Sequence, residues 1–161
     1  MKKLSLIVVA LLAVFLIFAS ATGTTPATGR VGYVAPNLSF ESEGRQLSLQ
    51  QFKGQCVVLT LWSTVEPVSR LRNKQYATRC DEHEAITHIS INLDRSEAVW
   101  RATLKADGVS PTLQAHCDVE AREKLEGPWH LDESLDSYLI GPDGIIIAVN
   151  PTAEQLAAVE G

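Results

Sequence analysis

Apolar runs and amphipathic segments alternate along this chain in a regular order. Three runs have the length of strands: residues 56–62, 86–93 and 112–117. The first two are rich in apolar and β-branched residues, and the third is shorter. A segment with the spacing of a helix follows each run: residues 67–80, 94–105 and 118–125. Gly127-Pro128 is expected to end the last of these helices. Strands joined by helices predict parallel pairing, because such crossovers are right-handed.

Both ends of this unit have the pattern of a β-hairpin. Residues 38–49 alternate around Glu43-Gly44, and Ser48 is expected to cap a short helical turn after the hairpin. Residues 135–149 place two apolar runs around Gly-Pro-Asp-Gly, which predicts a second hairpin. Asn150-Pro151 then predicts the start of a helix over residues 152–159. The sequence therefore predicts an α/β protein, with a mixed central sheet and helices on both faces.

The first 21 residues have the pattern of a secretory signal peptide. Lys2 and Lys3 precede an apolar run over residues 4–19, and Ala19-Ser20-Ala21 has the form of a cleavage site. The alternative is an uncleaved membrane anchor formed by residues 4–19. Residues 22–31 are small and polar and predict a flexible linker, so the domain is expected to occupy residues 32–161. An exported, periplasmic protein is therefore predicted.

The charge of the chain excludes one class of partner. Residues 1–21 hold two of the 14 Lys+Arg and none of the 19 Asp+Glu, so the remainder has 12 against 19, a net charge of −7. No basic stripe is present, and nucleic acid is therefore not expected as a partner. An acidic surface favours solubility and identifies no partner by itself.

Three cysteines allow at most one internal disulfide. Cys56 opens a predicted strand and Cys80 ends the next helix, so both are expected at the same end of the sheet. A Cys56–Cys80 bridge, two buried free thiols and a redox-active pair are the alternatives, and the bridge would be worth roughly 3–3.5 kcal/mol. Cys117 is either a small buried side chain or a displaced reactive thiol. Cys80 and His83 have the spacing of half a zinc site, but no second half follows, so no metal is predicted.

Several short motifs follow one another along residues 32–161. In chain order they are Gly32, Ala35-Pro36, Leu47-Ser48-Leu49, Phe52-Lys53-Gly54, residues 57–62, residues 90–94, Trp100, Tyr138-Leu139-Ile140 and Pro142-Asp143-Gly144. Their order and spacing resemble the thioredoxin fold, and in particular the exported redoxin branch of TlpA-like thiol-disulfide oxidoreductases and the alkyl hydroperoxide reductase/thiol-specific antioxidant group. The resemblance implies an inserted helix and strand between Asp94 and Asp118.

The same resemblance places the active-site cysteines of the family at positions that hold other residues here. The Cys-x-x-Cys motif follows the Trp of the strand, so its nucleophilic cysteine falls at Glu66 and its second cysteine at Ser69. The peroxidatic cysteine of a peroxiredoxin also falls at Glu66. The cis-proline of the family falls at Leu135, where a trans peptide is expected because a cis bond would cost ~2.5–4 kcal/mol. Because proline is favoured at the first helical position, Glu66 is expected to cap the helix that begins at Pro67. A carboxylate does not attack a disulfide.

These substitutions favour a redox-inactive binding or accessory module. In this interpretation an unidentified protein or peptide partner contacts Trp62, Glu66, Pro67 and Leu135. The alternative is a thiol-disulfide oxidoreductase or thiol antioxidant of envelope redox homeostasis that uses a non-standard cysteine such as Cys117. The sequence leaves enzymatic activity open and predicts no cofactor. Membrane contact is expected only through an uncleaved signal segment.

Overall fold

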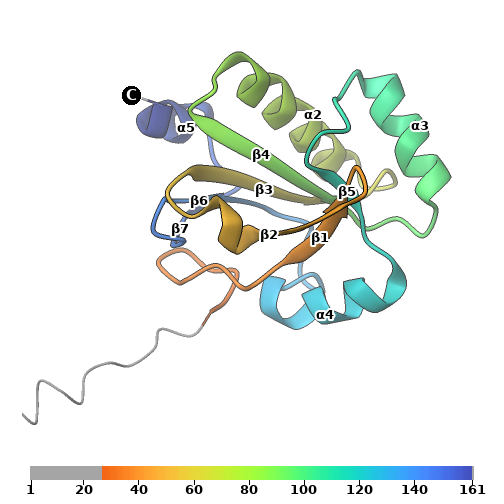
Figure 1. The fold of residues 1–161 in the computed structure, drawn as a ribbon, viewed down its shortest axis with the longest axis horizontal. Helices are drawn as coiled ribbons and strands as arrows, with labels where there is room; N and C mark the ends of the chain where they lie inside the picture. Colours follow the sequence, from red (N-terminus) through yellow and green to blue (C-terminus); the bar gives the residue numbers. More distant parts are fainter. Residues whose placement is uncertain (1–26, 161) are drawn as a thin grey trace, which may run out of the picture.

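Five strands form a mixed sheet in the order β5-β4-β3-β6-β7 in the computed structural model, which describes residues 27–160 (Figure 1). The strands are β3 (Cys56–Trp62), β4 (Ile86–Asn92), β5 (Gln114–His116), β6 (Ser137–Ile140) and β7 (Ile146–Val149). β3, β4 and β5 are parallel, whereas β6 runs antiparallel to β3 and β7 antiparallel to β6. The mixed sheet predicted from the sequence is confirmed.

Helices cover both faces of this sheet (Figure 1). They are α2 (Pro67–Glu82), α3 (Glu97–Asp107), α4 (Val119–Trp129) and α5 (Ala153–Glu160). Tyr76 of α2 and Leu156 of α5 pack with Val58 of β3 on one face. On the other face, Leu125 and Trp129 of α4 pack in a cluster with Leu59, Leu61, Ile89, Ile91 and Tyr138. Side chains of β3 alternate between the two clusters, as the pleat of a strand requires.

An N-terminal hairpin of β1 (Ser39–Ser42) and β2 (Arg45–Ser48) forms a separate two-stranded sheet. Its turn residues, Glu43 and Gly44, have φ values of 52° and 74°. Two successive positive φ angles match the twist of a two-residue hairpin. Ser48 then caps a 3₁₀ helix, η1 (Leu49–Phe52), in a capping box with Gln51. Both features were predicted from the sequence.

The domain begins before residue 32. The backbone N–H of Thr28 donates to the carbonyl of Val34, and that of Gly29 to the carbonyl of Pro128 at the end of α4. A Cβ on Gly29 would lie 3.3 Å from the Pro128 carbonyl oxygen, so a larger residue would crowd this contact. Residues 28–31 are therefore attached to the domain, contrary to the predicted linker. The predicted signal segment, residues 1–21, lies outside the described residues, among which no helix has the length and apolar character to cross a membrane.

The end of α4 differs from the prediction. The helix continues through Gly127-Pro128 and ends at Trp129, followed by His130 as its C-cap with a φ of 54°. Trp129 is fully buried, and its ring packs against Tyr138 with centroids 4.9 Å apart. The Tyr138 hydroxyl also donates to the Trp129 carbonyl at 2.9 Å. These tertiary contacts hold the last turn in place and outweigh the tendency of proline to end a helix.

The starts of α3 and α5 also lie later than predicted. Ser96 caps α3, since Asp94 contacts the loop after β3 instead of joining the helix. Asn150 is not a helix cap, because its φ is 50° and its side-chain oxygen accepts from the backbone N–H of Ser137. Thr152 takes the capping position of α5, where its hydroxyl accepts from the N–H of Gln155. Both corrections come from contacts between residues distant in sequence.

Polar side chains cross the buried face of the sheet beneath α2. His88 Nε2 lies 3.1 Å from Thr60 Oγ1, and the Ser137 hydroxyl donates to Thr60 Oγ1 at 3.3 Å. The His88 ring meets the edge of Tyr76, with centroids 6.5 Å apart. Burial lowers the pKa of His88 to about 3, because the charged imidazolium would lose its hydration. His88 is therefore neutral in the folded protein.

Mild acid is expected to destabilise the domain through His88. The unfolded chain protonates His88 near its ordinary pKa of about 6.5, whereas the folded protein does so only near a pKa of about 3. Between these values the free energy of unfolding falls with pH by up to about 1.4 kcal/mol per pH unit. Chemical denaturation between about pH 7 and about pH 4 measures this slope, and His88→Gln should flatten it. Equal slopes for the two proteins would contradict the assignment.

Candidate functional site

The junction between β3 and α2 is built around Glu66. The Glu66 carboxylate accepts hydrogen bonds from the backbone N–H groups of Val68 at 3.1 Å and Ser69 at 2.6 Å. Pro67 occupies the first helical position, where its missing N–H costs nothing. Hydrogen bonding at Ser69, together with the N–H of Val68, holds the pKa of Glu66 below its usual value. Glu66 is thus an ionised N-cap, as predicted.

The Ser69 side chain forms hydrogen bonds within the same junction. Its side chain is fully buried. The Ser69 hydroxyl donates to the Glu66 carbonyl at 3.1 Å and accepts from the backbone N–H of Ser63 at 3.3 Å. These bonds close the loop between the last residue of β3 and the first turn of α2. The hydroxyl therefore faces the interior and not a ligand.

Asp94 links this loop to the end of β4. Its carboxylate accepts from the Ser63 hydroxyl at 2.5 Å, from the Thr64 N–H at 3.0 Å and from the Asn92 side-chain amide at 3.0 Å. Burial opposes ionisation of Asp94, but the hydrogen bonds outweigh it and lower the pKa. This role was not predicted from the sequence. The position of Asp94 directly after a strand parallel to β3 was the available signal, because the carboxyl ends of parallel strands meet at one edge.

Three apolar side chains are exposed at this junction and form what we call the junction patch: Val65, Val68 and Leu71. They are 86%, 53% and 55% exposed. Their spacing of three residues continues from the loop into the first two turns of α2, which brings Val68 and Leu71 to the same side of the helix. Pro67 is exposed between them. The junction thus presents an apolar surface next to the Glu66 carboxylate.

Two arginines of α2 hold this surface in place. Arg70 forms a bidentate ion pair with Asp107 of α3. Its Nε donates to Oδ2 at 2.8 Å and its Nη2 to Oδ1 at 2.7 Å. Arg72 donates to the Leu135 carbonyl at 3.3 Å and lies 3.8 Å from Asp136. The α2 amino end is therefore tied to α3 on one side and to the segment before β6 on the other.

The four residues predicted to contact a partner do not all reach the surface. Glu66 is half-buried, Pro67 is exposed and Leu135 is partly buried against the core. Trp62, in contrast, is fully buried with Trp100 and Leu104. The prediction for Trp62 was wrong, because the pleat of β3 directs its side chain under α3. Peptide bonds are trans throughout residues 27–160, including the one at Leu135.

The three thiols lie away from the Glu66 carboxylate or are buried. Cys56 and Cys80 are free thiols that pack against the same apolar cluster, and no bridge joins them in this structure. Burial raises the pKa of Cys56 and raises that of Cys80 to about 11. Burial also raises the pKa of Cys117 to about 11. His116 does not activate Cys117, because its Nε2 lies 2.8 Å from the Asp94 carbonyl and its ring stacks on Trp100.

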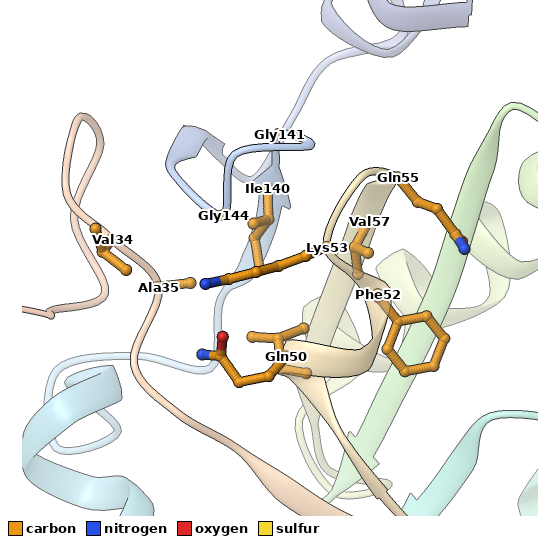
Figure 2. A pocket seen from close by; sticks show the side chains of 11 residues that line it. Val34, Ala35, Gln50, Phe52, Lys53, Gln55, Val57, Ile140, Gly141 and Gly144 are labelled. Atoms are coloured by element: carbon orange, nitrogen blue, oxygen red, sulfur yellow. The ribbon is translucent and has the colours of Figure 1, made fainter.

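No metal centre is evident among the described residues. Within residues 27–160, no group of three or more His, Cys, Asp or Glu side chains is placed to hold a metal ion. Figure 2 shows a pocket between η1 and the β6–β7 turn, across which the Lys53 side chain extends near Ala35. Its volume is about 20 Å³, which is room for about one water molecule. This pocket lies at the opposite end of β3 from Glu66.

The fold and the strand-to-helix junction define a thioredoxin-like protein. The structure is similar to a thioredoxin-like protein from Parabacteroides distasonis, with a TM-score of 0.69 and 26% identity over 83% of this chain and 96% of that one. It is also similar to the thioredoxin domain of a thiol-disulfide oxidoreductase from Bacteroides vulgatus, with a TM-score of 0.66 and 20% identity over 83% and 95%. A secreted thiol-disulfide isomerase from Corynebacterium glutamicum aligns with a TM-score of 0.63 and 17% identity over 80% and 83%.

The chain therefore belongs to the thioredoxin-like superfamily, as the sequence motifs suggested. No protein-family model matches the sequence, and no curated protein matches it. The inserted unit between Asp94 and Asp118 is present as α3 and β5.

Removal of the Glu66 carboxylate is expected to weaken the start of α2. Glu66→Ala leaves the N–H groups of Val68 and Ser69 without their acceptor, and loss of such a cap costs about 1 kcal/mol. Glu66→Ser keeps a capping oxygen and should retain most of this stability. Chemical denaturation of the three proteins measures the differences. Unchanged stability of Glu66→Ala would contradict a capping role for Glu66.

Proposed function

We propose that this protein is an exported, redox-inactive thioredoxin-like module that binds an apolar segment of a partner protein at the β3–α2 junction. The observation that carries the proposal is the hydrogen bonding of Glu66 and Ser69. Both side chains are engaged in the helix start, at the positions where the resemblance expects sulfur. The signal-like pattern of residues 1–21 and the description of one similar protein as secreted support export.

Sulfur chemistry is disfavoured by the positions of the remaining thiols. No cysteine lies between Cys56 and Cys80, so the first turn of α2, where the helix dipole would stabilise a thiolate, contains none. Cys117 follows β5 and has a pKa raised to about 11. At neutral pH such a thiol is almost entirely protonated, and the thiolate is the attacking species in disulfide exchange.

The junction patch supports a binding role. Val65, Val68 and Leu71 expose apolar surface that water solvates unfavourably, and covering each side chain would contribute up to about 1.5–3 kcal/mol. The Arg70–Asp107 contact holds α2 against α3, so the patch is already ordered before a partner arrives. An apolar segment of another protein fits this surface better than a polar metabolite does.

The purified protein is expected not to accelerate insulin reduction by dithiothreitol, because neither Glu66 nor Ser69 can exchange disulfides. The variant Glu66→Cys/Ser69→Cys places two thiols at the start of α2 and serves as the positive control. The turbidity of precipitating insulin chains measures both proteins. Wild-type activity that is lost in Cys117→Ser would instead support the alternative, an oxidoreductase or thiol antioxidant that uses a non-standard cysteine.

Loss of apolar area in the junction patch is expected to weaken partner binding. A reduced and alkylated unfolded protein is a suitable probe, since it exposes apolar segments without free thiols. Val68→Ser and Leu71→Ser should each weaken binding by up to about tenfold, the equivalent of about 1.4 kcal/mol. Fluorescence anisotropy of the labelled probe measures the affinity. Val99→Ser changes an equally exposed valine on α3 and is the matched control. Equal effects at residues 68 and 99 would overturn the binding role of the patch.

A further inference from the structure

The first two turns of α2 have an inverted distribution of polar and apolar side chains. We call this segment, residues 67–74, the α2 start. Its buried side chains are Ser69 and Asn73, both polar, whereas Val68 and Leu71 are exposed. A surface helix of a globular protein ordinarily buries its apolar side chains and exposes its polar ones. Apolar burial therefore contributes little to holding the α2 start against the sheet.

The two buried side chains do not tie the α2 start to the sheet by hydrogen bonds. Asn73 is 2% exposed, and its side-chain oxygen has no hydrogen-bond partner among the described residues. The hydrogen bonds of Ser69 stay within the junction, to the Glu66 carbonyl and from the Ser63 N–H. A buried acceptor without a partner raises the free energy of the packed state, and water can satisfy it once the helix lifts from the sheet.

The second half of α2 is packed in a different way. Tyr76 and Ala77 are buried, and Tyr76 lies in an apolar cluster with Val58 of β3. The Tyr76 hydroxyl also donates to the Pro151 carbonyl at 3.0 Å. In α4 the apolar packing already begins in the second turn, where Leu125 is buried in the core. The weak apolar packing is thus confined to the α2 start.

Ion pairs on its flanks hold the α2 start instead. α2 and α3 lie side by side (Figure 1), and the Arg70–Asp107 pair joins them through two short hydrogen bonds. The Asp107 side chain is only 14% exposed, so this pair is stronger than an ion pair in open solvent. On the other flank Arg72 lies 3.8 Å from Asp136, which is a looser contact. The Arg70–Asp107 pair is therefore a principal contact of the α2 start.

We propose that the α2 start opens locally as a unit, and that the Arg70–Asp107 pair keeps it closed. Residues 67–74 leave the sheet while β3 and the second half of α2 stay folded, which is a sub-global opening. In the opened state Val68 and Leu71 no longer share one side of a helix, so a partner that needs the junction patch binds only the closed state. This consequence for binding rests on the proposed function, whereas the opening itself does not.

Amide hydrogen exchange of the full chain at neutral pH tests the proposal. After correction for intrinsic rates, the amides of residues 71–74 should exchange at least about tenfold faster than those of residues 123–126, which hold the same positions in α4. Asp107→Asn removes the charge of the pair and should speed exchange at residues 71–74 by about fivefold or more.

Glu160→Gln is the matched control for Asp107→Asn. Glu160 forms a bidentate pair with Arg79 near the end of α2, at 2.8 Å and 2.7 Å, and its side chain is also 14% exposed. The two variants therefore remove equivalent pairs from opposite ends of one helix. Glu160→Gln should leave exchange at residues 71–74 within about twofold of the wild type.

A salt series on the wild-type chain gives a second measurement that needs no variant. A rise from about 0.05 M to about 1 M NaCl screens the Arg70–Asp107 pair and should speed exchange at residues 71–74 by about threefold or more. Equal protection of residues 71–74 and 57–62 would overturn the proposal, because both segments would then exchange only through global unfolding. Equal effects of Asp107→Asn and Glu160→Gln on residues 71–74, or exchange there that is unchanged by salt, would overturn it as well.

Discussion

The structure depends on the central position of β3. This strand is hydrogen-bonded to β4 on one edge and to β6 on the other, and its residues from Val57 to Trp62 are buried on both faces. A strand held on four sides has one register, so the point at which it ends is fixed. The loop from Ser63 to Val65 and the first turn of α2 therefore start from a fixed position. Asp94 reinforces it from the neighbouring parallel strand.

Features governed by nearby residues were predictable from the sequence, and features governed by distant residues were not. The bounds of β3, the turn at Glu43-Gly44 and the capping role of Glu66 follow from patterns within a few residues, and the structure confirms each. The end of α4 and the conformation of Asn150 depend instead on Tyr138 and Ser137, which local patterns do not connect to them. Trp62 was predicted to contact a partner because it lies next to the junction in sequence. The pleat of β3 instead directs its side chain into the interior.

The amino end of α2 carries its own anion. In a helix the first N–H groups are unpaired and the dipole favours negative charge, so this position attracts anionic ligands in many proteins. Here the Glu66 carboxylate occupies it and accepts from two of those N–H groups. A phosphate or carboxylate ligand would meet a like charge and occupied donors. What the junction exposes instead is the apolar surface of Val65, Val68 and Leu71.

The absence of sulfur between Cys56 and Cys80 has a consequence for the control of this surface. A dithiol at a helix start has two covalent states, and the redox potential of the compartment decides which of them a partner meets. A Glu66–Ser69 junction has a single covalent state. If the proposed partner binds the junction patch, its occupancy is set by the concentrations of the two proteins and by their affinity, in reducing and oxidising surroundings alike.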